Sequence, residues 1–297
     1  MTTEPRFGRV LTAMVTPFAE DGSLDLDGAA TLARWLVEQG NDALVVVGTT
    51  GEAPTLTHDE QIEVVAAVVE AVDVPVVAGA GSNDTRSAVR NTERCAEVGA
   101  DAILTVTPYY NRPSQAGLID HFTAVAEASD LPVILYDIPP RSGRKIETAT
   151  LLRLADEVET IVAVKDAAGD VAETARLVAA APEGFEVYSG EDALTLALLA
   201  VGAVGTISVA SHWVTPELVR MFEEFFSGDH AAAQESNRRL IPSYDFESGD
   251  LRPNPVPSKA MMKVLGLPGG DCRLPMGPEP DSLQGEARRL LADLGRG

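Results

Sequence analysis

Short apolar segments rich in β-branched residues alternate along most of the chain with longer segments of helical periodicity. The apolar segments are continuous, which is typical of strands that are buried on both faces of a parallel sheet. The predicted strands span residues 10–15, 43–47, 74–78, 102–106, 132–136, 161–164, 186–189 and 204–207. The helical segments that follow them span residues 27–39, 58–72, 84–98, 114–128, 147–155, 171–181, 192–201 and 216–226.

This alternation predicts an α/β fold. Eight strand–helix units in about 225 residues favour a closed (β/α)8 TIM barrel over an open doubly wound sheet. The strand pattern stops near Gly228, and three further helical segments follow at 230–244, 257–265 and 282–294. We therefore predict a catalytic barrel domain over residues 1–228 and a C-terminal helical extension over residues 229–297 that covers the barrel or contacts another subunit.

The charge of the chain excludes some classes of partner. It has 45 Asp and Glu residues against 23 Lys and Arg residues, a net charge of −22, which argues against nucleic acid and anionic membranes as partners. Two explanations of this acidity remain open: adaptation to high salt, or the residue bias of a GC-rich genome. The N-terminus lacks the pattern of a signal peptide, and no apolar run is long enough to span a membrane. We expect a cytoplasmic protein.

Cysteine and histidine give no sign of a metal site. Cys95 and Cys272 form neither a disulfide framework nor a zinc-binding spacing, and the histidines are scattered. We expect no metal ligands in this chain.

Lys165 directly follows the apolar segment 161–164. A buried ammonium needs a partner or loses its proton, and a neutral lysine amine is a good nucleophile towards a ketone. In a TIM barrel, catalytic residues gather at the C-terminal ends of the strands. The alternative is a lysine whose charged end reaches out of the strand end into solvent.

Other polar residues follow the ends of other strands. Thr49 and Thr50 lie between two glycines, where hydroxyl and backbone N–H groups can hold a small carboxylate, although an ordinary turn has the same pattern. Tyr110 and Tyr136 can relay protons or be structural, and Arg141 can clamp a carboxylate or be a solvated loop residue. Together with Lys165 they are what an enzyme needs to join a 2-oxo acid to an aldehyde through a Schiff base.

At these residues the chain resembles the class I pyruvate aldolases of the N-acetylneuraminate lyase family, which includes the 4-hydroxy-tetrahydrodipicolinate (dihydrodipicolinate) synthases. The resemblance covers essentially the whole chain. The runs that carry it are 47–52 (Val-Gly-Thr-Thr-Gly-Glu), 104–115 (Leu-Thr-Val-Thr-Pro-Tyr-Tyr-Asn-Arg-Pro-Ser-Gln), 134–139 (Ile-Leu-Tyr-Asp-Ile-Pro), 164–166 (Val-Lys-Asp), 254–257 (Asn-Pro-Val-Pro) and 273–276 (Arg-Leu-Pro-Met).

The resemblance implies a mechanism. Lys165 forms an imine with pyruvate, while Thr49 and Thr50 hold the pyruvate carboxylate. Thr49, Tyr136 and Tyr110 form a proton relay in which Tyr110 reaches into the site of a neighbouring subunit. The family also implies a homotetramer built as a dimer of dimers, and neither a metal nor a nucleotide cofactor.

The resemblance assigns further residues to the substrates. Arg141 binds the carboxylate of aspartate semialdehyde, Ile207 offers a backbone carbonyl near the imine, and Gly190 lines the pyruvate pocket. Because the sugar-acid lyases usually lack this arginine, Arg141 favours a synthase that condenses pyruvate with L-aspartate 4-semialdehyde in lysine and diaminopimelate biosynthesis. The alternatives are a pyruvate aldolase that acts on 2-keto-3-deoxy sugar acids or neuraminate, and a non-catalytic barrel that binds a 2-oxo acid.

The chain departs from the family at several positions. Asp137 and Asp166 replace a common asparagine and glutamate, and a carboxylate near the lysine would raise its pKa. Lysine feedback sites in the family correspond here to His58, Asn83 and Tyr109, but their glutamate and second histidine are replaced by Ser87 and Gln61. We therefore predict weak or absent inhibition by lysine.

Overall fold

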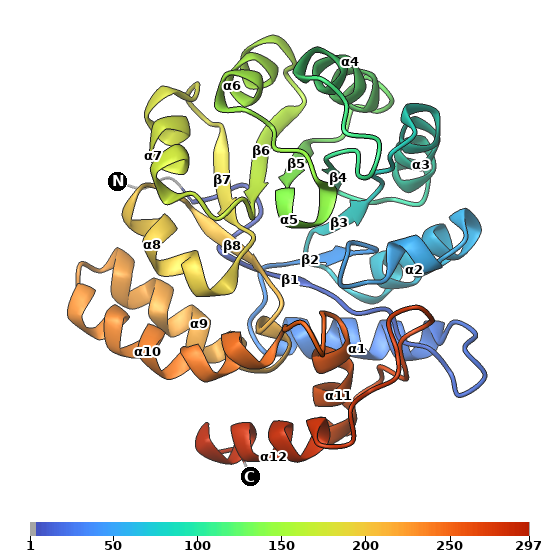
Figure 1. Ribbon diagram of the computed structural model, residues 1–297, viewed down its shortest axis with the longest axis vertical. Coiled ribbons are helices and arrows are strands. Elements are labelled where there is room, and N and C mark those ends of the chain that lie inside the picture. Colours follow the sequence, from blue (N-terminus) through green and yellow to red (C-terminus); the bar gives the residue numbers. More distant parts are fainter. Residues whose placement is uncertain (1–3, 297) are drawn as a thin grey trace.

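The computed structural model describes residues 4–296. Over that range, eight parallel strands close into a barrel in sequence order, and β1 pairs with both β2 and β8 (Figure 1). The strands are β1 Val10–Ala13, β2 Ala43–Val46, β3 Val76–Gly79, β4 Ala102–Val106, β5 Val133–Asp137, β6 Ile161–Asp166, β7 Glu186–Ser189 and β8 Gly205–Ser208. The predicted (β/α)8 barrel is confirmed.

Helices surround the barrel and continue beyond it as a C-terminal extension (Figure 1). They are α1 Leu26–Glu38, α2 His58–Ala71, α3 Thr85–Glu97, α4 Gln115–Ala126, α5 Pro139–Ser142, α6 Thr148–Glu157, α7 Val171–Ala180, α8 Thr195–Ala200, α9 Ser211–Phe226, α10 His230–Phe246, α11 Val256–Leu265 and α12 Leu283–Asp293. Two short 3₁₀ turns, η1 Ala53–Thr55 and η2 Asp192–Leu194, follow β2 and β7.

The apolar strands serve two separate cores, which explains why their sequences are continuous rather than alternating. One set of side chains fills the barrel interior and includes Leu11, Val45 and Ile134. The other set, which includes Leu44 and Leu135, packs outward against the helices. Burial on both faces stabilises the strands by the hydrophobic effect and leaves the strand ends as the place for polar groups.

The structure differs from the sequence prediction where elements are short or interrupted. The helix α5 and the two 3₁₀ turns have only three or four residues each, too few to show a helical period. The helix α9 begins at Ser211, five residues before the predicted start at Pro216. Its backbone is non-helical at Val214, because a proline cannot donate the hydrogen bond of a continuous helix.

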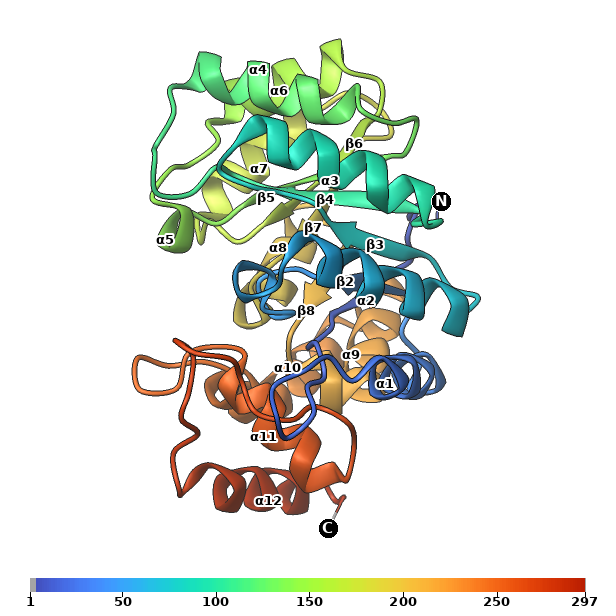
Figure 2. The same cartoon turned by 90° about the vertical axis from the view of Figure 1, so that its right-hand side faces the viewer.

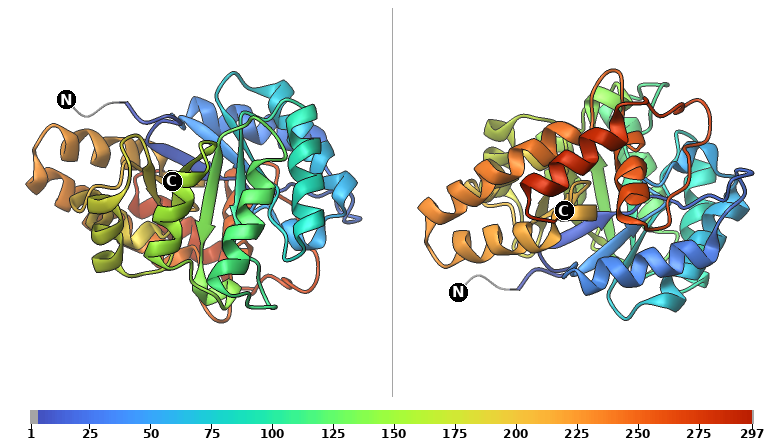
Figure 3. Two further views of the ribbon diagram at one scale, coloured as in Figure 1. Left: turned by 90° about the horizontal axis from the view of Figure 1, so that it is seen from above. Right: turned by 90° about the horizontal axis from the view of Figure 1, so that it is seen from below.

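The helices α10, α11 and α12 lie together on the side of the barrel that carries α1 and α9 (Figures 2 and 3). The indole of Trp213 in α9 donates a hydrogen bond to Ser243 in α10, so the extension is tied to the last barrel helix. The division at residue 228 remains a prediction. Within residues 4–296 no helix is both long and apolar enough to cross a membrane.

Candidate active site

Lys165 on β6 and Tyr136 on β5 are register partners in the parallel sheet. Both are buried, and the Lys165 Nζ atom lies 4.4 Å from the centroid of the Tyr136 ring. The strand β6 therefore continues through Lys165 rather than ending before it. A lysine whose charged end reaches into solvent would be exposed, whereas this side chain is only 5% exposed.

Burial lowers the pKa of the Lys165 amine to about 8. Desolvation is the main cause, because it penalises the charged form, and the nearby Arg141 acts in the same direction. The carboxyl groups of Asp192, Glu247 and Glu191 oppose this shift. Near neutral pH the residue therefore holds an appreciable fraction of neutral, nucleophilic amine.

The acidic groups that act on Lys165 form a buried cluster. Asp192 Oδ2 accepts hydrogen bonds from the N–H groups of Val209 and Ala210 at 2.8 and 2.9 Å. The other Asp192 oxygen has no hydrogen-bond partner within the described residues, and neither has Glu247 Oε2. Burial and the neighbouring Asp192 raise the pKa of Glu247 well above its usual range. The neighbouring Asp192 therefore disfavours the ionised form of Glu247.

Asp137 and Asp166 do not have the effect on the lysine that their sequence positions suggested. Side chains alternate along a strand, so the residue after Lys165 points away from it. Asp166 accepts hydrogen bonds from Thr174 Oγ1 at 2.6 Å and from the Ala168 N–H at 2.9 Å. Asp137 forms a salt bridge with Lys145, with 2.6 Å between Oδ2 and Nζ. The carboxyl groups that raise the pKa of Lys165 come instead from β7–η2 and the end of α10.

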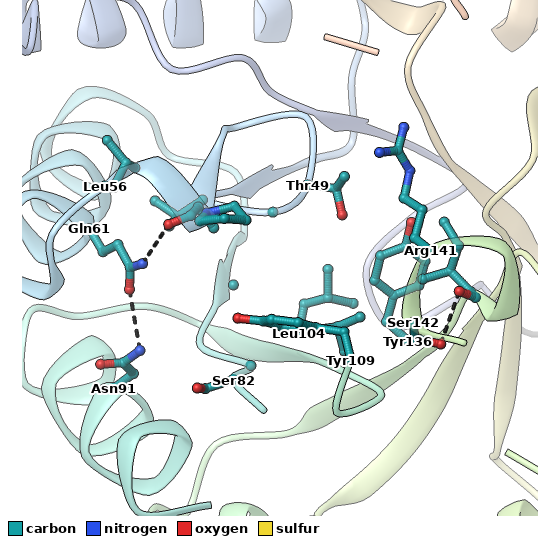
Figure 4. Close-up of a pocket in the computed structure, with 18 of the residues that line it drawn as sticks. Thr49, Leu56, Gln61, Ser82, Asn91, Leu104, Tyr109, Tyr136, Arg141 and Ser142 are labelled. Atoms are coloured by element: carbon teal, nitrogen blue, oxygen red, sulfur yellow. Dashed lines mark hydrogen bonds between the residues drawn. The ribbon is translucent and has the colours of Figure 1, made fainter. Parts of the chain in front are cut away.

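A cavity of about 460 Å³ is lined by Tyr136, although Lys165 itself is not among its lining residues. Tyr136 and Arg141 lie on one side of it, Gln61 and Asn91 lie on the other, and Thr49 lies between them (Figure 4). Because the Tyr136 ring lines the cavity and also lies under the Lys165 amine, this tyrosine connects the two.

The surroundings of Tyr136 act on its hydroxyl proton. Burial raises the pKa of this phenol to about 12, while the Arg141 charge and a hydrogen bond with Thr49 oppose the rise. The phenol is therefore neutral and can both donate and accept a proton through its hydroxyl group. Thr49 and Arg141 are next to Tyr136, as a proton relay and a carboxylate site require.

Thr50 is not among the residues that line the cavity, and it is 3% exposed. Its hydroxyl oxygen accepts a hydrogen bond from Asn254 Nδ2 at 2.9 Å.

Gly190 and Ile207 lie inside the barrel end. A Cβ atom at Gly190 would lie only 2.9 Å from Lys165 Cγ, so this position has no room for a side chain. Ile207 is buried in the barrel interior together with Tyr136.

Tyr110 is separated from these residues. Its side chain is 90% exposed, and its backbone has φ = 74°, a left-handed conformation that is strained for a bulky residue. The loop that carries it is held by a hydrogen bond from the Tyr110 N–H to the Ser142 carbonyl. Within the single chain, Tyr110 does not line the cavity.

Two of the three candidate regulatory residues line the cavity. His58 and Tyr109 line it, whereas the Asn83 carbonyl accepts a hydrogen bond from Asn111. Gln61 donates to the Ala53 carbonyl and accepts from Asn91, so both ends of its amide are used. Among residues 4–296, no aspartate or glutamate lines the cavity, and Arg141 gives it a positive charge.

Some residues of the site had no signal in the sequence. Asp192 follows β7 and could have been considered as another residue after a strand end. Glu247 and Asn254 belong to the C-terminal extension, and only the fold brings them to the barrel end. Asn254 stands in a run that carries the family resemblance, but nothing in the run indicates its contact with Thr50. Over residues 4–296, no group of three or more His, Cys, Asp or Glu side chains could hold a metal.

Known proteins are similar to this chain over nearly its whole length. A model of the dihydrodipicolinate synthetase family matches residues 6–294. The chain is 48% identical over 273 residues to the 4-hydroxy-tetrahydrodipicolinate synthase of Moorella thermoacetica, which covers 91% of this chain and 92% of that protein. It is 49% identical over 300 residues to 4-hydroxy-tetrahydrodipicolinate synthase 2 of Streptomyces coelicolor, with 100% and 97% covered. The crystal structure of the dihydrodipicolinate synthase from Cyanidioschyzon merolae with lysine bound superposes with a TM-score of 0.96 at 41% identity, covering 99% of this chain and 100% of that one.

Proposed function

The chain belongs to the dihydrodipicolinate synthetase family, and from this premise we propose that it condenses pyruvate with L-aspartate 4-semialdehyde through a Schiff base on Lys165. It is a lyase of lysine and diaminopimelate biosynthesis that gives 4-hydroxy-tetrahydrodipicolinate. The observation that supports the proposed chemistry most directly is the buried Lys165 amine beside the Tyr136 ring, with its pKa lowered to about 8.

The first half of the reaction activates pyruvate. The neutral Lys165 amine attacks the ketone carbon, a C–N bond forms, and the carbonyl oxygen leaves as water. Proton transfer to that oxygen is assigned to Tyr136, whose hydroxyl is neutral and adjacent to Thr49. Loss of a proton from the pyruvate methyl group then gives the enamine, and the protonated imine nitrogen takes up the electrons.

The second half joins the two substrates. The enamine carbon adds to the aldehyde carbon, and a proton is delivered to the new alkoxide. The amine of the semialdehyde then attacks the imine carbon, which closes the ring, and the C–N bond to Lys165 breaks to release the free lysine amine. Arg141, exposed at the cavity edge, is proposed to bind the semialdehyde carboxylate, while Thr49 and Thr50 hold that of pyruvate. The Ile207 carbonyl lies at the end of β8 and is assigned to the imine region. Gly190 has no side chain that would collide with the Lys165 chain on which the adduct forms.

We also propose that the working enzyme is a homotetramer built as a dimer of dimers. The exposure of the strained Tyr110 is what a residue would show if a second subunit covered it. Tyr110 then completes the proton relay with Thr49 and Tyr136 across the subunit boundary. Sedimentation at micromolar protein would test the assembly. A cytoplasmic location suits an enzyme of amino-acid biosynthesis.

The substrate proposal is tested by offering several aldehydes to the enzyme with pyruvate. Aspartate semialdehyde should be consumed with a kcat/KM about ten- to a hundred-fold above that of neutral or sugar-derived aldehydes, because a hydrogen bond to a charged group contributes about 1.5–3 kcal/mol. Faster turnover of a 2-keto-3-deoxy sugar acid or of neuraminate would favour the lyase alternative.

A further inference from the structure

One residue of the C-terminal extension hydrogen bonds directly to the threonine pair after β2. Asn254 Nδ2 donates to Thr50 Oγ1 at 2.9 Å, across 204 positions of sequence. Both side chains are buried, Thr50 at 3% and Asn254 at 7% exposure. A buried contact between such distant segments indicates a defined arrangement of these two groups.

The other end of the Asn254 amide contacts a second hydroxyl group. The Ser258 hydroxyl, one turn further along in α11, donates to Asn254 Oδ1 at 3.4 Å and is fully buried. With its carbonyl end accepting from Ser258, the amide turns its amino end to Thr50. An amide NH₂ group can only donate, so the Thr50 oxygen is the acceptor in this contact.

This contact decides where the Thr50 proton points. A hydroxyl group has one proton and two lone pairs. With a lone pair occupied by Asn254, the remaining O–H bond is directed away from it. No acceptor for this proton is found within residues 4–296. The hydroxyl is therefore a ready donor, and accepting a hydrogen bond polarises it further.

A second contact holds the two segments together. Lys259 Nζ in α11 lies 2.6 Å from Glu52 Oε1, two residues after Thr50, and both side chains are buried. Glu52 Oε2 also accepts from the Arg273 N–H at 2.9 Å. The loop that carries Thr50 is thus fixed to the helix that carries Ser258, which keeps Asn254 at hydrogen-bonding distance from Thr50.

We propose that Asn254 is a positioning residue of the condensation: it turns the Thr50 hydroxyl proton towards the carboxylate of the bound 2-oxo acid. This inference rests on the proposed role of Thr50 in binding pyruvate. It adds that the C-terminal extension is part of the keto-acid site, although Asn254 itself need not touch the substrate.

The test is a double-mutant cycle on the full-length enzyme, with Asn254→Leu as the probe variant. Leucine has nearly the shape of asparagine, carries no charge and has no donor, and the main-chain carbonyl that accepts from Arg141 at 3.5 Å remains. The readout is the pyruvate concentration that half-saturates borohydride labelling. It is measured without aldehyde, so that binding of the second substrate by Arg141 does not contribute. Thr50→Val provides the second background.

We expect Asn254→Leu to raise the half-saturating pyruvate concentration about three- to ten-fold in the wild-type background, as for loss of one neutral hydrogen bond. In the Thr50→Val background, where no hydroxyl remains to be oriented, the same change should have less than about a two-fold effect. No change, or equal rises in both backgrounds, would overturn the inference. Ser258→Ala is measured in the same cycle and should shift in the same direction, which keeps the test valid if the leucine variant does not fold. Failure of pyruvate to label the wild-type enzyme would contradict the proposed function itself.

Discussion

Lys165 and Tyr136 are paired in register on adjacent strands, and the lysine Nζ lies 4.4 Å from the tyrosine ring centroid. In a parallel sheet, register partners point to the same face, so both side chains enter the barrel end together. The tyrosine ring also lines the cavity. Tyr136 therefore connects the cavity with the buried amine of Lys165.

Tyr136→Phe should lower kcat by about a hundred- to ten-thousand-fold, because it removes a proton-transferring hydroxyl and keeps the ring under Lys165. The measurement is steady-state turnover together with thermal unfolding, which should change little.

Tyr188→Phe is the matched control for this variant. Tyr188 also lies inside the barrel, but its hydroxyl donates to Glu186 and accepts from the Phe7 N–H. Its loss should leave kcat nearly unchanged. Equal losses in the two variants would contradict the assigned role of Tyr136.

The pH dependence of imine formation should follow the Lys165 amine. With a pKa of about 8, the rate at fixed pyruvate should rise about ten-fold per pH unit below that value and level off above it, because only the neutral amine attacks. The rate of cyanoborohydride labelling between pH 6 and pH 10 measures this profile.

Asp192→Asn should move that profile to lower pH. The Asp192 carboxylate raises the pKa of Lys165, so its removal lowers the pKa, and the asparagine oxygen can still accept from the Val209 and Ala210 N–H groups. Arg141→Met should move the profile the opposite way, because the Arg141 charge lowers the same pKa. Shifts of the same sign in both variants would contradict this assignment of charges.

Lys259→Met should reduce the free energy of unfolding by about 3–5 kcal/mol, since it leaves the buried Glu52 carboxylate without its ion-pair partner. Adding Glu52→Gln should recover part of this loss, because no buried charge then remains. Urea denaturation of the two variants gives both values. A double variant at least as unstable as the single variant would show that the ion pair is not the cause.

Lysine should inhibit the enzyme weakly or not at all at millimolar concentration. The cavity lined by His58 and Tyr109 has no acidic residue among the described ones to bind a lysine ammonium, and the Ser87 hydroxyl is hydrogen-bonded to Asp84. Ser87→Glu would supply a carboxylate and should increase any sensitivity to lysine. Strong inhibition of the wild-type enzyme would show that the prediction is wrong.

The barrel could be predicted from sequence because its strands are buried on both faces. Continuous β-branched segments leave few alternatives when helical segments separate them. The short helix α5, which carries Arg141, was not predicted because four residues show no period. The start of α9 at Ser211 was not predicted, because Pro216 interrupts the helix and the backbone at Val214 is non-helical.

Residues of the candidate site were predictable where they follow a strand directly, as Thr49 and Lys165 do. Contacts between distant segments were not, because sequence spacing carries no information about them. The Asn254–Thr50 hydrogen bond and the Asp192–Glu247 pair are of this kind. Asp166 shows the opposite error: adjacency in sequence suggested an effect on Lys165, but strand alternation turns its side chain away.

The central claim is that Lys165 forms an imine with pyruvate, and borohydride reduction followed by peptide mass spectrometry tests it most directly. The chain has three other lysines, Lys145, Lys259 and Lys263, which serve as internal controls. We predict a carboxyethyl group on Lys165 alone, and no labelling in Lys165→Arg. An unlabelled protein, or a label on one of the other three lysines with Lys165 unmodified, would contradict the account.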